Sequence, residues 1–170
     1  MSGPDEHWDR SMAALWATLD AVPADAFVAA VERMAATLPA GDPAGLFERA
    51  CAHDSTGHPE RAVPLYQAAL AAGLTGLKRR RASIQLASSL RNLGDAAAAR
   101  RLLVAELAAP SDVLDGAVRA FLALALADLG REREALSISL DALSRYLPRY
   151  NRSLARYAAA LVAPEATPGP

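Results

Sequence analysis

The chain has only one cysteine, Cys51, so no disulfide can form within it. A lack of disulfides is typical of proteins that work in a reducing compartment. No apolar run approaches the roughly 18 residues that a membrane span requires. A surplus of positive charge is also lacking, because 18 Lys and Arg stand against 19 Asp and Glu, whereas nucleic-acid-binding proteins are usually basic. The first ten residues contain early acids and no apolar stretch of the kind found in a secretory signal. We therefore expect a cytoplasmic protein that binds neither membranes nor nucleic acid.

Hydrophobic residues are abundant, at 52% of 170 residues, and charged residues make up 22%, as in ordinary globular domains. A chain of this length forms a single domain. Apolar residues recur at helical spacing in segments that proline and glycine separate, which predicts an all-α fold of about nine helices. Trp8 and Trp16 share one face of the first segment, where core packing is the expected role of large aromatic side chains.

The stretch from Leu77 to Gly94 is predicted to be the central helix. Most of its circumference is apolar, and five polar residues form one narrow stripe at i, i+3, i+7, i+10 and i+14. These are Lys78, Arg81, Gln85, Ser88 and Asn92. A helix with this balance packs on two sides and leaves one strip open. Gly94 then ends the helix in a left-handed turn, and Asp95 is a suitable N-cap for the next one.

The unit of helix, turn and helix repeats along the chain. Its turn glycines are Gly57, Gly94 and Gly130, spaced 37 and 36 residues apart. An alanine stands five residues after each glycine, and another stands seven residues before it. The first set is Ala62, Ala99 and Ala135, and the second set is Ala50, Ala87 and Ala123. Small residues in phase with amphipathic helices indicate places where two helices approach closely.

These residues resemble tetratricopeptide repeats, in which small residues at the eighth and twentieth positions let paired helices pack. The sequence departs from the family pattern in two ways: Ser139 stands where a large residue is usual, and the repeats are longer than the usual ~34 residues. These departures indicate a divergent member of the family, similar to short bacterial repeat proteins. The resemblance implies a right-handed α-solenoid of antiparallel helix pairs in one domain, 1–163. It implies an N-terminal capping pair at 2–41, three repeats at 43–146, a capping helix at 148–163 and a disordered tail at 164–170.

The chemistry-bearing residues do not form a recognisable catalytic or metal motif. Cys51, His53, Asp54 and His58 have the side chains that bind zinc, but three or four ligands must converge on the metal. Cys51, Asp54 and His58 share a helical face only if a helix continues through Gly57. A nucleophile elbow, a phosphate loop and paired catalytic acids are all absent from the sequence. We expect no enzyme activity, no metal and no cofactor.

The family resemblance implies that positions two, five, nine and twelve of each first helix line a concave groove. In the middle repeat these positions are Arg81, Ile84, Ser88 and Arg91, with Gln85 and Asn92 adjacent, and neighbouring repeats add Phe47, Cys51, Asp54, Ala117, Ala120, Leu124 and Ala127. We expect Arg81, Gln85, Ser88, Arg91 and Asn92 to bind a segment of a protein partner. In the alternative, the basic residues from Lys78 to Arg81 pair with the chain's own acids, and Asp54 or Asp128 neutralises Arg91. The competing function is that of a structural subunit or homo-oligomer, which associates through apolar end surfaces and has no peptide ligand.

Overall fold

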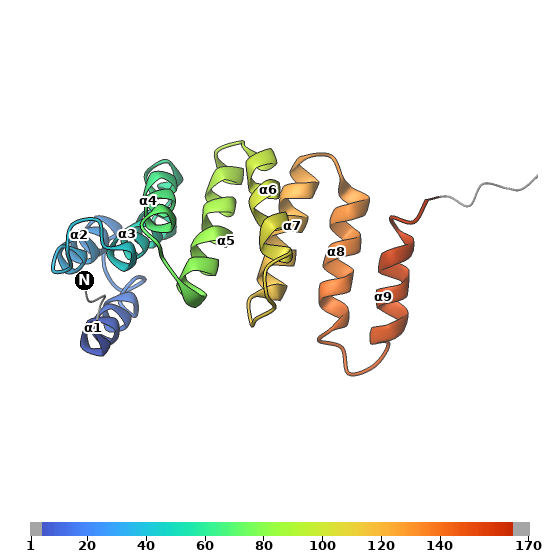
Figure 1. Ribbon diagram of the computed structural model, residues 1–170, viewed down its shortest axis with the longest axis horizontal. Helices are drawn as coiled ribbons and strands as arrows, with labels where there is room; N and C mark the ends of the chain where they lie inside the picture. The colour runs from blue at the N-terminus through green and yellow to red at the C-terminus, as the bar shows by residue number, and fades with distance from the viewer. Residues whose placement is uncertain (1–4, 165–170) are drawn as a thin grey trace, which may run out of the picture. The chain divides into compact units, whose positions relative to one another are not determined.

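The computed structural model describes residues 5–164, which form nine α-helices and contain no β-strand (Figure 1). The helices are α1 (Glu6–Trp16), α2 (Ala24–Ala35), α3 (Pro43–Ser55), α4 (Pro59–Ala71), α5 (Gly76–Asn92), α6 (Ala96–Leu107), α7 (Asp115–Asp128), α8 (Glu132–Ser144) and α9 (Asn151–Ala160). The all-α prediction is confirmed. The chain divides into two compact units, Met1–Gly94 and Asp95–Pro170, which are described separately below.

In the first unit, α3 packs against α2, α4 and α5, and α4 packs against α5. The repeat alanines Ala50 and Ala62 are fully buried in α3 and α4, as expected where two helices touch. Phe47 and Tyr66 fill the space beside them, with their ring centroids 6.3 Å apart. The large side chains thus flank a contact that only small residues allow.

The first helix pair is built on aromatic side chains instead. Trp8, Met12, Phe27, Val31 and Ala52 form a buried cluster, and the indole of Trp16 meets the Phe27 ring edge-on at 5.1 Å. The Trp8 indole N–H also donates to the Met34 carbonyl (3.3 Å) and to the Thr37 hydroxyl (3.2 Å). The expected core role of the tryptophans is confirmed for Trp8, which is 8% exposed, while Trp16 is only half-buried.

Individual residues decide where the helices of the first unit begin, continue and end. The first helix begins at Glu6 because the Asp5 carboxylate accepts the Trp8 N–H at 2.8 Å, and Ser2 to Pro4 lie outside the described residues. In α4, Pro64 is an interior residue, and the helix continues through it. Leu93, expected in the apolar part of the central helix, is the C-cap of α5 and is 49% exposed. Helix ends are where periodicity gives the least information.

In the second unit, α7 packs between α6 and α8, and α9 packs on α8. Asp95 caps α6 as predicted, since its carboxylate accepts the Ala98 N–H at 2.8 Å. The Asp112 carboxylate accepts the backbone N–H of Leu114, the residue before α7, at 2.7 Å. Only Ala158 of α9 is fully buried. The predicted disordered tail, 164–170, falls almost wholly outside the residues that the structure describes.

The turn glycines follow the repeat pattern. Gly57, Gly94 and Gly130 have φ angles of 83°, 90° and 71°, a left-handed conformation that is costly for residues with a Cβ. Within residues 5–164, none of the helices has the length and apolar character needed to cross a membrane.

Candidate functional site

A cleft of about 630 Å³ opens in the first unit between α1, α3 and α5. Its lining combines apolar and polar side chains from three helices that are far apart in the sequence. These are Asp9, Met12, Ala13 and Trp16 from α1, Glu48, Cys51 and Ser55 from α3, and Lys78, Arg81 and Gln85 from α5. Three residues of the polar stripe, Lys78, Arg81 and Gln85, therefore form one wall of the cleft, and α1 forms the wall across from it.

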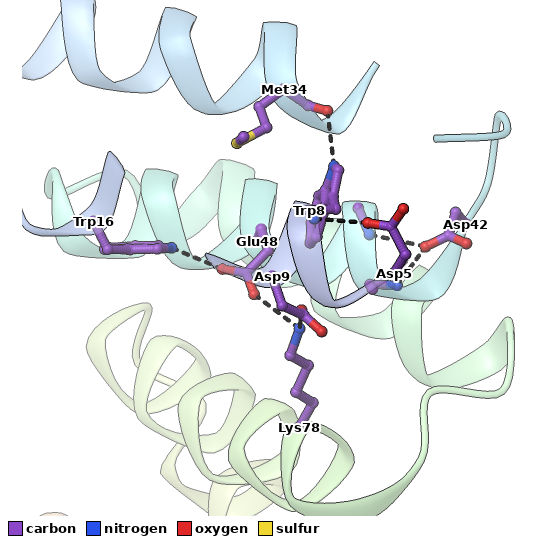
Figure 2. Close-up of polar contacts among 10 residues, drawn as sticks. Asp5, Trp8, Asp9, Trp16, Met34, Asp42, Glu48 and Lys78 are labelled. Atoms are coloured by element: carbon purple, nitrogen blue, oxygen red, sulfur yellow. Dashed lines mark hydrogen bonds and ion pairs between the residues drawn. The ribbon is translucent and has the colours of Figure 1, made fainter. Parts of the chain in front are cut away.

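Charged residues tie the cleft walls together. Lys78 Nζ lies 2.8 Å from Asp9 Oδ1 and 3.5 Å from Glu48 Oε1, and the Trp16 indole N–H donates to Glu48 Oε2 at 2.7 Å (Figure 2). The Glu48 side chain is only 8% exposed, so its charge requires these partners. Lys78 is therefore neutralised within the protein by two carboxylates.

Arg81 and Gln85 lie one helical turn apart on the α5 wall. The exposed Arg81 guanidinium covers the buried Phe47 ring, with its carbon 5.3 Å from the ring centroid. Among residues 5–164, no carboxylate lies within 4 Å of this guanidinium. The Gln85 carbonyl oxygen accepts the Cys51 thiol at 3.4 Å, so its amide nitrogen is left to donate.

The other three residues predicted for the site do not line this cleft. Ser88 is half-buried on α5. Arg91 and Asn92 stand at the C-terminal end of the same helix, where the Arg91 guanidinium donates to Asn92 Oδ1 at 3.2 Å. Of the five predicted residues, the cleft brings together Arg81 and Gln85.

Beneath the cleft lies a buried polar cluster. Asp54 accepts hydrogen bonds from Ser89 at 2.8 Å and Tyr66 at 3.3 Å. Burial raises the pKa of Asp54, although both hydrogen bonds oppose the shift. Burial also raises the pKa of the Cys51 thiol to about 12, and it raises the pKa of Tyr66. In each case burial disfavours the charged form of the group, which suits a structural role.

Each of the four candidate zinc ligands contacts a different residue of the protein. Cys51 faces Gln85 and Asp54 faces Ser89, while His53 Nε2 lies 3.5 Å from Glu32 and His58 Nδ1 lies 3.3 Å from Glu60. In the described part of the chain, no three His, Cys, Asp or Glu side chains converge as metal binding requires.

The wall formed by α1 and the residues that anchor it were not predicted from the sequence. Glu48 carried a usable signal, because it stands 37 residues before Gln85, the same interval that separates the turn glycines Gly57 and Gly94. Phe47 and Ile84 were expected to line the concave groove, but they are only 0% and 4% exposed. The helix turns these two side chains into the core and brings Glu48 and Gln85 to the cleft.

Comparison with known proteins agrees with the repeat pattern. A family model described as tetratrico peptide repeat matches residues 43–161, well over half of the chain. Searches of curated proteins and of solved structures gave no significant match. The matched region begins at the N-terminus of α3, so the aromatic pair α1 and α2 precedes it. The buried alanines, the left-handed turn glycines and this match together show that the chain belongs to the tetratricopeptide repeat family.

Proposed function

We propose that the protein is a non-catalytic interaction module that binds a segment of a protein partner in the cleft between α1, α3 and α5. Tetratricopeptide repeats generally mediate protein–protein interaction. The observation that carries the proposal is the pair of donors on one wall of the cleft, Arg81 and Gln85, facing a wall with apolar side chains.

The two walls suit a partner that presents an acceptor next to an apolar side chain. Contact with Phe47 restricts the Arg81 guanidinium, so less side-chain freedom is lost when it binds. A hydrogen bond from a charged donor contributes about 1.5–3 kcal/mol. Trp16 on the opposite wall offers apolar contact, since it is only half-buried. A carboxylate or a backbone carbonyl beside an apolar side chain would satisfy both walls.

The remaining predicted residues extend this site along α5. Arg81 and Arg91 are ten residues apart, which is roughly 15 Å along a helix axis. One carboxylate cannot reach both, whereas an extended segment can. We assign Ser88, Arg91 and Asn92 to contacts beyond the cleft, and Lys78 to positioning the walls because Asp9 and Glu48 already neutralise it.

The experiment is a binding assay with a partner captured from the native cell and identified by mass spectrometry. Arg81→Ala should weaken binding about tenfold, since 1.4 kcal/mol is a factor of ten, and Gln85→Ala should weaken it less. Arg61→Ala is the matched control, because Arg61 on α4 is 64% exposed and lies outside the cleft. Thermal melts of all three variants should match the parent protein. Unchanged binding for both cleft variants would exclude this cleft as the partner site.

The second candidate function is a structural subunit or homo-oligomer. Its support is the apolar surface on α8, where Leu136 and Leu143 lie two turns apart and are each 49% exposed. Light scattering after size-exclusion chromatography tests this proposal. An oligomer that dissociates in Leu136→Ser/Leu143→Ser, together with no effect of Arg81→Ala on partner capture, favours the structural function.

A further inference from the structure

The turn between α8 and α9 and the start of α9 concentrate arginine and tyrosine without any acid. Residues 144–164 contain no Asp or Glu. We define the arginine–tyrosine corner as Arg149, Arg152, Arg156, Tyr146, Tyr150 and Tyr157. Arg145 is not included because it pairs with Asp141 at 3.3 Å.

The corner is open to solvent. Tyr146, Tyr150 and Tyr157 are 72%, 77% and 60% exposed, and the three arginines are exposed as well. In the part of the chain that the structure describes, these arginines form no ion pair. The Arg156 guanidinium carbon lies 5.4 Å from the ring centroid of its neighbour Tyr157. Three exposed arginines and three exposed tyrosines therefore lie within one short segment of the second unit, residues 146–157.

Two features of the corner oppose local stability. Arg152 and Arg156 are four residues apart on α9, where like charges repel, and Arg152 stands in the first turn, next to the positive end of the helix. Tyr150 adopts a left-handed conformation with φ 66°, the only non-glycine residue in the described chain that does so. A bulky residue is strained in this conformation, and burial does not compensate Tyr150.

We propose that the arginine–tyrosine corner is a second binding surface of this protein and that it takes an acidic segment of a protein partner. Carboxylates on that segment would relieve the repulsion between Arg152 and Arg156. Arginine and tyrosine are also the residue types that contribute most at protein interfaces, where the ring supplies contact area and the guanidinium binds carboxylates in pairs. The surface belongs to the second unit and is independent of the cleft in the first.

The charge balance of the second unit favours an acidic protein over nucleic acid. Residues 95–164 contain nine arginines and eight acidic residues, so outside the corner the six remaining arginines are outnumbered by the acids. A nucleic-acid surface neutralises many phosphates and requires a wider basic region. A short acidic peptide matches the three arginines and leaves the rest of the unit uninvolved.

Fluorescence anisotropy at low ionic strength tests the proposal with a short labelled peptide of alternating glutamate and leucine. The glutamine counterpart of the peptide and an oligouridylate of equal length serve as comparison probes. Arg152→Glu and Arg156→Glu should each weaken binding of the glutamate peptide by about tenfold or more. Arg101→Glu is the matched control, because Arg101 is an exposed arginine on α6 and the change in charge is the same. Arg81→Ala should leave this binding unchanged, so the two proposals fail separately.

Tyr150→Gly separates binding from folding. Glycine accepts the left-handed conformation without strain, so the melting temperature should stay the same or rise. Binding of the glutamate peptide should nevertheless fall, because the exposed ring is lost. Equal losses in Arg101→Glu and Arg152→Glu would overturn the proposal, as would unchanged binding in both Arg152→Glu and Tyr150→Gly. Tighter binding of the oligouridylate than of the glutamate peptide would also overturn it.

Discussion

At the scale of single residues, burial determines how Cys51 behaves. The thiol is 2% exposed and donates to Gln85, and its pKa rises to about 12 because the charged form is poorly solvated. Only the thiolate is a good nucleophile. We therefore expect alkylation by iodoacetamide at pH 8 to be far slower in the native protein than in urea. Mass spectrometry over time measures both rates, and equally fast native labelling would show that the cluster around Cys51 is open.

The raised pKa of Cys51 also makes the free energy of unfolding decrease at alkaline pH. The native state holds the Cys51 proton more tightly than the unfolded chain, whose thiol has the ordinary pKa of 9.0. The contribution of this group is thus fully present below about pH 9 and is lost as pH rises toward about 12. The raised pKa of Tyr66 acts in the same direction. Urea unfolding across this range should give a smaller decline for Cys51→Ala than for the parent protein.

At the scale of helices, the repeat alanines set how closely α3 and α4 approach. Ala62 on α4 is fully buried in the packed unit. A larger side chain there would push the helices apart, so Ala62→Leu should lower the free energy of unfolding by about 1–3 kcal/mol. Chemical denaturation measures the change. The matched control is Ala71→Leu near the end of the same helix, where the side chain is exposed and the expected change is within about 0.5 kcal/mol.

The first helix pair shows a second solution to helix packing. Its contact surfaces are formed by the large side chains of Trp8, Trp16 and Phe27, whereas the repeats pack through alanines. The alanine that the repeat interval places in this helix, Ala13, is exposed and lines the cleft. An aromatic pair therefore precedes the region that matches the family, and its first helix provides a wall of the candidate site.

At the scale of the whole molecule, stability should vary along the chain. Helices of a repeat protein contact mainly their sequence neighbours, so a terminal helix has fewer partners than an internal one. In the second unit, α7 has five buried residues and α9 has one. Hydrogen exchange followed by mass spectrometry should show amides of α9 exchanging about tenfold or more faster than those of α7. Equal protection of the two helices would mean that the second unit opens as one cooperative block.

The sequence by itself determined the helices and their repeat. Apolar spacing defined which face of α5 is buried, and the interval between Gly57, Gly94 and Gly130 marked the turns that require a left-handed residue. These properties are local, because helix periodicity and glycine conformation depend on residues close together in the chain. The same local information named Arg81 and Gln85 as members of an open polar stripe.

Only the tertiary structure decided what faces that stripe. Lys78 meets Asp9, a residue 69 positions away, and Trp16 meets Glu48, 32 positions away. Helical periodicity orients a side chain about its own axis, but it does not say which distant helix will lie opposite. Arg91 and Asn92 show how far helical periodicity can predict a site, because they share the helix with Arg81 and yet lie beyond the cleft. Likewise, the tyrosines after α8 are visible in the sequence, whereas the left-handed conformation and the exposure of Tyr150 appear only in the tertiary structure.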